Sequence, residues 1–390
     1  MRHYSAAGGR DGRLKLVQVN YAFTPMDSPD ALLDAYHTLT GWSDAAADAG
    51  LSVSVVQACS TNAVRRRGAV DYLFCQPGGP RQLSPALMHA AVAACEPDVV
   101  HVNGLDAPLR AWRLRHALPP HVAIVVQDHA GSPPSALSLR AAVRRMAMRA
   151  ADAYLFTAAP QADAWIEGGF IRAGAVHAVL EASTGMRPVP RDTARALSGI
   201  DGAPAILWVG RLDANKDPLT VLDGFELALP SMPGATLTMV FGDDPLLAVV
   251  QARIGASAAL RDRVRLAGRM PRAQMAAWYS AADLFVAGSR RESCGYALLE
   301  ACACGAVPVV TDIPSFRRIT CDGVIGALWP AGSAQALASA LAAVARRNLD
   351  AERARTRAHF DRHLDWAAVG AEAKAVYEAV VEARRRRGGR

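Results

Sequence analysis

The chain of 390 residues is long enough for two domains of ordinary size. Hydrophobic residues make up 51% of it and charged residues 20%, a balance that excludes an intrinsically disordered protein. The formal net charge of +7 comes from the two ends, because arginines outnumber acids in 1–13 and in 384–390. The body between them is neutral, so the bulk charge does not indicate a nucleic-acid partner. Of the 43 basic residues, only three are lysines: Lys15, Lys216 and Lys374.

The seven cysteines are dispersed and lack the paired spacing of a zinc site, so we expect reduced, mostly buried thiols and no metal site. Residues 1–13 contain no apolar stretch, which argues against a signal peptide. No run approaches the ~18 apolar residues of a membrane span. The sequence therefore predicts a cytoplasmic protein.

Short runs rich in Val, Ile and Leu alternate with alanine-rich helical stretches along the chain. Runs this apolar, separated by helix-length segments, are typical of parallel strands that are buried on both faces. Two such series predict two doubly wound, Rossmann-like α/β domains. The first series is Leu14–Val19, Ser52–Ala58, Val99–Val102, Ala123–Val126 and Ala153–Phe156. The second is Ala205–Val209, Thr236–Phe241, Val264–Ala267, Leu284–Val286 and Val307–Val310.

The segment Glu181–Pro204, which is rich in proline and glycine, separates the two series and reads as a linker. After about residue 334 the chain is predicted to be helical to its end. We therefore expect one domain over 1–185, a second over 186–365, and a disordered basic tail over 384–390. Ligands of open α/β sheets bind beyond the carboxyl ends of the strands, so two such domains would place a substrate in the cleft between them.

A first candidate site follows the strand that ends at Gly210. Arg211 comes at the strand tip, and Lys216 lies just before Pro218, which suits the first turn of a helix. An arginine and a lysine five residues apart across such a turn can both reach one anionic group, such as a diphosphate. The alternative is an ordinary solvated turn. Because lysine is rare in this chain, its use at position 216 favours a site that needs a compact point charge.

A second candidate site follows the strand Leu284–Val286. Gly295 opens a helix, and the free N–H groups of a helix start can bind an anion. Glu292 lies before this helix and Glu300 about two turns into it. Carboxylates beside an anion site suit a ligand that also carries hydroxyls, and a sugar nucleotide combines both. The alternative is that Glu300 is an ordinary helix-surface residue.

A third candidate is His129, which follows the strand Ala123–Val126. We expect it at the edge of the cleft, able to donate to an anion or a sugar oxygen. His101 lies inside the strand Val99–Val102, and we expect it to point into the fold.

The stretch ESCGYALLE at 292–300 resembles the E-x7-E motif of the family-four retaining glycosyltransferases. WVGRLDANKDPLTVLDGF resembles the G-R-x4-K stretch of that family, and MVFGDDP, VRLAGRMPRAQMAAWYSAADLFV and ACACGAVPVVTD follow in the expected order. The similarity is specific over 205–330 and diffuse over 14–180. It implies the two-domain GT-B fold, with a carboxyl-terminal helix, here about 366–383, that packs back on the first domain.

The resemblance also implies roles for single residues. Arg211 and Lys216 would hold the donor diphosphate and stabilise the departing charge. Glu292 would hold sugar hydroxyls, and His129 would contact the transferred sugar. Because Arg and Lys take the place of a cation, neither a metal nor a cofactor is implied. The resemblance implies that the acceptor attacks from the front face of the sugar, which needs no side-chain nucleophile. The sequence shows no candidate triad.

The remaining donor-binding positions surround these residues. Glu300 would bind the ribose hydroxyls, and the segment Gly268–Met270 would border the base. The full set that we expect to bind the donor is Gly210, Gly268, Arg269, Met270, Gly295, Tyr296, Ala297 and Glu300.

Two segments depart from the family pattern. Asn20–Pro25 replaces a glycine-rich loop after the first strand, and Asp312–Arg318 replaces a glycine pair and a glutamate. The first departure concerns the acceptor side. In the second, Arg317 or Arg318 either contacts the substrate or belongs to a solvated turn.

The sequence thus predicts a retaining, metal-independent glycosyltransferase of the hexosyltransferase type. Its donor would be a nucleotide-diphosphate sugar, and its acceptor a glycan, a lipid-linked sugar or a small molecule in polysaccharide or glycolipid biosynthesis. The alternatives are a nucleotide-sugar 2-epimerase of the same fold and a non-catalytic glycan-binding subunit. A helix over 138–150 carries arginines at i,i+4 spacing and can rest on the anionic inner face of a membrane, or it is an ordinary outer helix.

Overall fold

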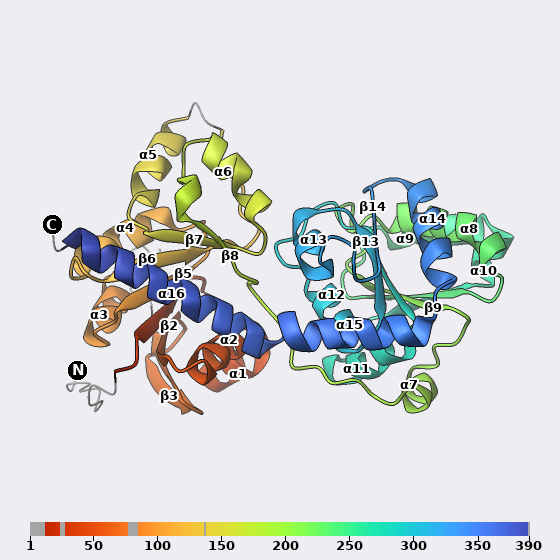
Figure 1. The fold of residues 1–390 in the computed structure, drawn as a ribbon, viewed down its shortest axis with the longest axis horizontal. Helices are drawn as coiled ribbons and strands as arrows, with labels where there is room; N and C mark the ends of the chain where they lie inside the picture. The colour runs from red at the N-terminus through yellow and green to blue at the C-terminus, as the bar shows by residue number, and fades with distance from the viewer. Residues whose placement is uncertain (1–11, 24–27, 77–84, 136–137, 389–390) are drawn as a thin grey trace. The chain divides into compact units, whose positions relative to one another are not determined.

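The computed structural model describes residues 12–23, 28–76, 85–135 and 138–388 (Figure 1). The chain divides into two compact units, each with its own core. Unit 1 comprises Met1–Ala182 and Trp366–Arg390, and unit 2 comprises Ser183–Asp365. Two doubly wound α/β domains were predicted from the sequence, and both are present.

In the described part of unit 1, eight strands form one sheet in the order β3-β4-β2-β1-β5-β6-β7-β8. The β3–β4 pair is antiparallel, and the other neighbouring strands are parallel. Val19 of the central strand pairs in register with Val56 on one side and Val102 on the other, and all three are fully buried. The strands are β1 (Lys15–Asn20), β2 (Ser52–Ala58), β3 (Ala63–Arg67), β4 (Val70–Cys75), β5 (Val99–Asn103), β6 (Ala123–Gln127), β7 (Ala153–Phe156) and β8 (Val176–Ala178).

Helices cover both faces of this sheet, which explains why its strands are apolar on both sides (Figure 1). Ser28 caps α1 and Ser138 caps α5 by accepting a hydrogen bond from a backbone N–H three residues on. Pro108 occupies the first turn of α4, where its missing N–H has no cost. The helices are α1 (Pro29–Ala35), α2 (His37–Asp48), α3 (Ala86–Ala94), α4 (Pro108–Ala117), α5 (Leu139–Met148), α6 (Asp163–Glu167) and α16 (Trp366–Gly388), with the 3₁₀ turns η1 (Ala159–Ala162) and η2 (Ala173–Ala175).

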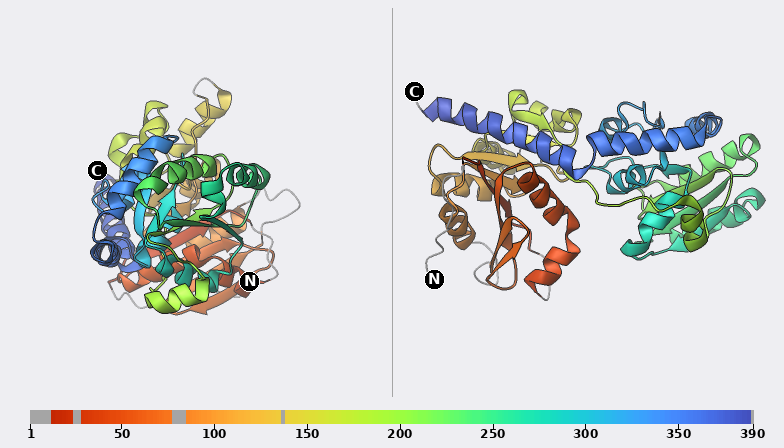
Figure 2. Two further views of the ribbon diagram at one scale, coloured as in Figure 1. Left: turned by 90° about the vertical axis from the view of Figure 1, so that its right-hand side faces the viewer. Right: turned by 60° about the horizontal axis from the view of Figure 1, so that its bottom comes forward.

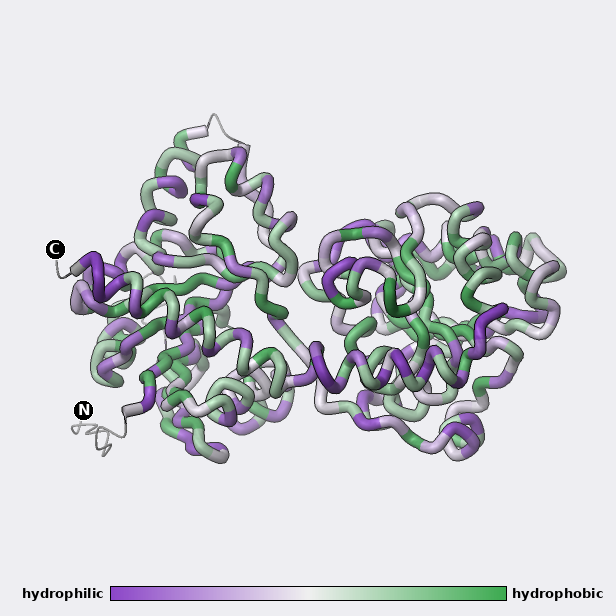
Figure 3. Tube along the Cα trace, in the orientation of Figure 1, coloured by the Kyte–Doolittle hydropathy of each residue, from purple (hydrophilic) through white to green (hydrophobic). Residues whose placement is uncertain are grey.

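In the described part of unit 2, six strands form a parallel sheet in the order β11-β10-β9-β12-β13-β14. Figure 3 shows hydrophobic residues concentrated along the central strands of each unit. The strands are β9 (Ala205–Gly210), β10 (Thr236–Phe241), β11 (Val264–Gly268), β12 (Leu284–Ala287), β13 (Val307–Thr311) and β14 (Ala327–Trp329). The helices are α7 (Arg191–Ser198), α8 (Pro218–Ala228), α9 (Leu247–Gly255), α10 (Ala258–Arg261), α11 (Arg272–Ala281), α12 (Tyr296–Ala303), α13 (Pro314–Thr320), α14 (Ala334–Ala345) and α15 (Leu349–His363), with the 3₁₀ turn η3 (Leu229–Ser231).

All ten predicted strands are present, whereas β3, β4, β8 and β14 were not predicted. Four of the five residues of β3 are exposed, so this edge strand has no apolar run to reveal it. Strands β8 and β14 have three residues each, too few for a recognisable pattern. Gly68, at φ +56°, makes the turn between β3 and β4 in a conformation that glycine adopts at little cost.

The predicted linker Glu181–Pro204 is a folded part of unit 2 over most of its length. It contains α7, whose Arg191 and Arg195 both form ion pairs with the buried carboxylate of Asp283. Asp283 also accepts a hydrogen bond from the backbone N–H of Ala205 at 2.8 Å. The prolines and glycines of this segment therefore belong to irregular backbone that packs against unit 2, and not to a flexible linker.

The carboxyl-terminal helix α16 packs on unit 1, as Figure 2 shows for the dark-blue helix. Two glycines bring it close to α2. A Cβ on Gly370 would lie 2.3 Å from the backbone oxygen of Ala45, and a Cβ on Gly41 would meet the ring of Trp366 at 2.4 Å. Close backbone contact at this helix pair therefore requires the absence of a side chain at both positions.

The prediction of a disordered basic tail over 384–390 was wrong for residues 384–388, which continue α16. Arg384 forms an ion pair with Asp152 at 3.0 Å, and Arg385 one with Asp98 at 2.8 Å. The acids lie in unit 1, so sequence charge counts could not show that these arginines have partners. Residues 389–390, like 1–11, lie outside the described residues.

We expect Gly370→Ala to lower the free energy of unfolding by about 1–3 kcal/mol, because the new methyl group must displace the backbone of Ala45. Urea denaturation followed by circular dichroism measures the loss. The matched control is Gly174→Ala, also in unit 1, where an added Cβ meets no atom within 4 Å among the described residues. Equal stability of the two variants would contradict close packing at Gly370.

Candidate functional site

Two loops at the carboxyl ends of neighbouring strands of unit 2, one after β9 and one after β12, are joined to each other. The side chain of Asn215 donates to the carbonyl of Arg291 at 3.0 Å and accepts from its N–H at 3.1 Å. A Cβ on Gly288 would lie 3.1 Å from the carbonyl oxygen of Lys216, so the two backbones nearly touch. The loops therefore form one unit that holds both candidate motifs.

The structure brings Lys216 and Glu292 together as an ion pair between these loops. Their side chains are 21% and 15% exposed, so the pair is largely shielded from water. Asp213 accepts a hydrogen bond from the backbone N–H of Lys216 at 2.9 Å and forms an ion pair with Arg211 at 2.7 Å. Arg211 itself is 59% exposed, which leaves its guanidinium accessible to a ligand. Two cations and two carboxylates thus gather at one point.

Gly210 leaves room for the stem of Lys216. A Cβ at this position would lie 3.2 Å from the indole of Trp208 and 3.5 Å from Cδ of Lys216. The next residue after the lysine, Asp217, adopts φ +45° and caps α8 through Thr220, while Arg290 holds its other oxygen at 2.7 Å. The turn from β9 into α8 is therefore fixed on both sides of Lys216.

Two features of the backbone at position 295, the start of α12, require a glycine. Its φ of +90° is unfavourable for other residues, and a Cβ would lie 2.5 Å from the ring of Phe316. Tyr296 and Ala297 follow in the first turn and are half-buried. The first N–H groups of a helix have no partner within it, and those of α12 lie beyond the carboxyl end of β12, where a parallel sheet binds ligands.

Glu300 is buried, so the alternative of an ordinary helix-surface residue was wrong. Its carboxylate accepts a hydrogen bond from Arg272 at 2.9 Å and one from the hydroxyl of Tyr279 at 2.9 Å. Burial raises the pKa of Glu300, and these two partners oppose the rise. Arg272 also donates to the hydroxyl of Tyr296 at 2.7 Å. Sequence reasoning missed Arg272 and Tyr279, although both lie in the stretch that resembles the glycosyltransferases.

The segment Gly268–Met270 ends β11 near the loop after β10. Gly268 adopts φ +71°, and Met270 is half-buried. Arg269 is 76% exposed and lies 3.7 Å from Asp243. It also donates to the carbonyl of Gly242 at 3.4 Å. The predicted contact of this segment with a base stays a prediction.

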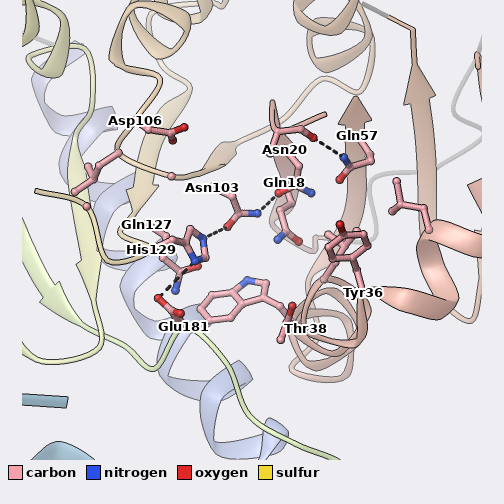
Figure 4. A pocket seen from close by; sticks show the side chains of 17 residues that line it. Gln18, Asn20, Tyr36, Thr38, Gln57, Asn103, Asp106, Gln127, His129 and Glu181 are labelled. Carbon is pink, nitrogen blue, oxygen red and sulfur yellow. Dashed lines mark hydrogen bonds and ion pairs between the residues drawn. The ribbon is translucent and has the colours of Figure 1, made fainter. Parts of the chain in front are cut away.

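His129 belongs to unit 1, at the carboxyl end of β6, whereas the other predicted site residues belong to unit 2. Its Nδ1 lies 3.5 Å from Glu181, and its Nε2 lies 3.3 Å from the side-chain oxygen of Asn103 (Figure 4). Burial lowers the pKa of His129, but the hydrogen bond and charge of Glu181, with nearby carboxylates, outweigh it and raise the pKa. Glu181 was read only as the start of a linker, because nothing local links it to a histidine 52 residues earlier.

His129 lines a cavity of about 540 Å³ in unit 1 (Figure 4). The cavity opens at the carboxyl ends of β1, β2, β5 and β6, where Asn20 and Asn103 hydrogen-bond to each other. Asn20 begins the segment that departs from the glycine-rich loop of the family, and residues 24–27 of that segment lie outside the described residues.

His101 and Arg317 show two contrasting outcomes. His101 is fully buried, as predicted, and its Nδ1 lies 2.5 Å from the hydroxyl of Tyr377. Burial lowers its pKa to about 3. Arg317 lies in the last turn of α13, so the expected solvated turn was wrong, and it forms ion pairs with Asp312 and Asp322. No group of three or more His, Cys, Asp or Glu side chains in the described residues is arranged to hold a metal ion.

Helix α5 has an exposed apolar side formed by Leu139, Val143 and Met146, and Leu139 is 82% exposed. The predicted row of arginines on this helix is only partly free for a ligand. Arg144 packs on the ring of Trp165, and Arg145 donates to the carbonyl of Gly168 at 2.8 Å. Among the described helices, none is long and apolar enough to cross a membrane.

Residues 190–359 match the family described as glycosyl transferases group 1. The chain is 35% identical over 183 residues to the phosphatidyl-myo-inositol mannosyltransferase of Mycobacterium leprae (strain TN). That match covers 45% of this chain and 46% of the relative, so the chain spans about half the length of the curated relative that it matches.

Solved structures match over nearly the whole chain at low sequence identity. The sucrose-phosphate synthase of Thermosynechococcus elongatus has a TM-score of 0.66 at 20% identity, covering 95% of this chain and 100% of that one. HepE of Anabaena, in complex with UDP and glucose, has a TM-score of 0.67 at 18% identity, covering 94% and 100%. These likenesses confirm the predicted GT-B fold class. The chain is therefore a protein of the GT-B fold class, and residues 190–359 of its second unit match the glycosyl transferases group 1 family.

Proposed function

We propose that the protein is a glycosyltransferase that moves a sugar from a nucleotide-diphosphate sugar to an acceptor hydroxyl, with retention of configuration and without a metal. The observation that carries the proposal is the shielded Lys216–Glu292 pair with Arg211 beside it, at the carboxyl ends of β9 and β12. A diphosphate needs cations, and a sugar needs carboxylates that accept hydrogen bonds from its hydroxyls. One joined pair of loops supplies both.

The proposed chemistry follows from where each charge lies. Nζ of Lys216 and the exposed guanidinium of Arg211 would neutralise the diphosphate as it departs with the bonding electrons. Glu292 would accept hydrogen bonds from the sugar, and the first N–H groups of α12 would add donors. The leaving phosphate would accept the proton of the attacking hydroxyl, so no side-chain nucleophile is required. These fixed cations would make a metal ion unnecessary.

Glu300 would bind the ribose hydroxyls. Arg272 and Tyr279 hold both of its oxygens, which fixes the direction of the carboxylate before a ligand binds. His129 would donate from its protonated ring to an oxygen of the transferred sugar. Its pairing with Glu181 favours that protonated form.

We also propose that α5 rests on an anionic membrane surface near the acceptor. The exposed apolar side chains of α5 are flanked by Arg140 and Arg149, both exposed, and the helix contains no acidic residue. A groove of about 640 Å³ between α4 and α5 adds exposed apolar surface from Leu109. Apolar insertion combined with positive charge is the usual basis of peripheral membrane binding.

We expect Lys216→Ala to lower kcat/KM for the donor at least about 100-fold, because the departing diphosphate loses its best-shielded cation. Release of nucleoside diphosphate from UDP-, GDP- and ADP-sugars, with and without a set of acceptors, measures the effect. The matched control is Lys15→Ala, which removes an exposed pair with Glu96 in unit 1. Unchanged turnover in Lys216→Ala would contradict the diphosphate role.

The same assay separates the alternatives by their products. An altered nucleotide sugar or a free sugar formed without any acceptor would identify an epimerase. Nucleotide binding without turnover would identify a binding subunit. Failure of every donor both to bind and to react would overturn the proposal as a whole.

We expect Glu181→Gln to lower the pKa of His129, because burial is then opposed only by the smaller effects of Asp128 and Asp106. An NMR titration of the His129 ring measures the shift, with Glu96→Gln as a control that leaves it unchanged. A raised folded-state pKa stabilises the fold fully below the ordinary value of 6.5, and this stabilisation is lost as the pH rises through the raised value. The stability difference between wild type and Glu181→Gln should therefore shrink above that pH. An unchanged titration midpoint would refute the pairing.

We expect the protein to sediment with phosphatidylglycerol vesicles and not with phosphatidylcholine vesicles, and binding to weaken as salt is added. Leu139→Asp should reduce binding severalfold, because it places a charge on the apolar side of α5. Leu197→Asp is the matched control, since Leu197 is also exposed but lies on α7 of unit 2. An equal effect of both substitutions would argue against a membrane role for α5.

A further inference from the structure

Arg272 occupies an unfavourable place for a cation in its own helix. It is the first residue of α11, where the partial positive charge of the helix dipole opposes a basic side chain. The sequence of the first turn, residues 272–275, contains no acidic residue that would compensate for this charge. The stability of α11 therefore does not explain an arginine at this position.

The partners of Arg272 lie on the neighbouring helix α12. Its Nη1 donates to Oε1 of Glu300 at 2.9 Å, and its Nη2 donates to the hydroxyl of Tyr296 at 2.7 Å. The guanidinium carbon also lies 5.3 Å from the centre of the Tyr296 ring. Arg272 thus bridges two residues that are about one helical turn apart, and both belong to the set that we expect to bind the donor.

The carboxylate of Glu300 is almost fully enclosed. Its side chain is 7% exposed, whereas that of Arg272 is 44% exposed. The buried Tyr279 donates its hydroxyl to Oε2 of the same carboxylate at 2.9 Å. A carboxylate has about four acceptor positions and these two partners use one on each oxygen, so capacity remains for the hydroxyls of a ribose.

An enclosed carboxylate tends to take up a proton, and Arg272 opposes this tendency. Burial raises the pKa of Glu300, and the charge of Arg272 is the largest effect that lowers it, followed by the hydrogen bonds from Tyr279 and Arg272. Burial also raises the pKa values of the neighbouring Tyr279, Tyr296 and Cys304, so these groups are uncharged at neutral pH.

Two arginines of α15, Arg353 and Arg357, lie near the carboxyl end of α12. Both donate to backbone carbonyls, and their charges act on Cys304. Among the described residues, Arg272 is therefore the only cation that forms an ion pair with Glu300.

We propose that Arg272 is a positioning residue of the donor site, which keeps the carboxylate of Glu300 ionised and directed so that it accepts hydrogen bonds from the ribose of the donor. The proposal rests on the donor binding proposed above and adds Arg272 to it. Hydrogen bonds to an ionised carboxylate are roughly twice as strong as those to a neutral acid. The preference for ribose over 2′-deoxyribose therefore depends on Arg272.

Titration of the ligand-free full chain tests the ionisation. Carbon-detected NMR of glutamate-labelled protein, with Glu300→Gln to assign the signal, gives the titration midpoint of the Glu300 carboxyl. We expect Arg272→Met to raise this midpoint, because the largest effect that opposes burial is lost. The matched control is Arg347→Met, which removes a similarly exposed arginine from Glu352 in the same unit. An unchanged midpoint in Arg272→Met, or an equal rise in the control, would overturn the proposal.

Calorimetric titration with UDP, GDP and ADP and with their 2′-deoxy forms tests the role in binding. We expect the wild type to prefer ribose about tenfold and a folded Arg272→Met to lose most of this preference. The ratio of the two affinities cancels the titration of the phosphates, so its change with pH reports on the protein. In Arg272→Met the ratio should fall as the pH falls through the raised midpoint of Glu300, because the ionised form is lost there. A folded Arg272→Met that keeps the full preference would refute the positioning role.

Arg272→Lys separates the charge from the position of the carboxylate. Lysine keeps the charge but lacks the planar fork that reaches Glu300 and Tyr296 together. We expect the titration midpoint to return close to that of the wild type and the ribose preference to return only in part, with circular dichroism to show that each variant is folded. A lysine variant as impaired as Arg272→Met in both measurements would indicate a merely structural role and contradict the proposal.

The same measurements separate this proposal from the proposed function. A wild type that binds none of the nucleoside diphosphates overturns the proposed donor binding, and the donor role of Arg272 with it. Nucleotide binding whose ribose preference is unaltered in Arg272→Met counts against the role of Arg272 alone and leaves the glycosyl transfer standing.

Discussion

Burial of the parallel strands on both faces is the constraint on which both candidate sites depend. Inside such a sheet most residues are apolar, as Val19 and Val102 are, and the buried His101 uses its Nδ1 to pair with Tyr377. Polar groups that are to meet a ligand can therefore lie only where the strands end. In unit 1 these groups include Asn20 and the end of β5, and in unit 2 they begin one residue after β9.

The two units differ in the chemistry that they place at these ends. Unit 2 gathers Lys216, Arg211, Glu292 and Asp213 in two joined loops, so cations and carboxylates alternate over a short distance. Unit 1 places amides around a cavity with no lysine or arginine among its described lining residues. The first arrangement suits a ligand with a diphosphate and a sugar.

Features set by local sequence could be predicted. The ten predicted strands were found because an apolar run needs no distant partner to be recognised. The turn at Gly210–Lys216 and the helix start at Gly295 were found because glycine and proline fix the backbone locally. By contrast, the exposed edge strand β3 and the three-residue strands lack such a pattern. The basic end of α16 was assigned to disorder because its partners, Asp98 and Asp152, lie far away in the chain.

The sequence by itself determined two Rossmann-like domains and the two motifs that resemble the glycosyltransferases, since hydrophobic period and glycine spacing are local properties. Only the tertiary structure decided which charges meet. Lys216 and Glu292 are 76 residues apart, Arg272 and Glu300 are 28 apart, and each pair forms because parallel strands bring their carboxyl ends to one edge of the sheet. Glu181, which the sequence analysis assigned to the linker, proves to be a partner of His129 that raises the pKa of its ring.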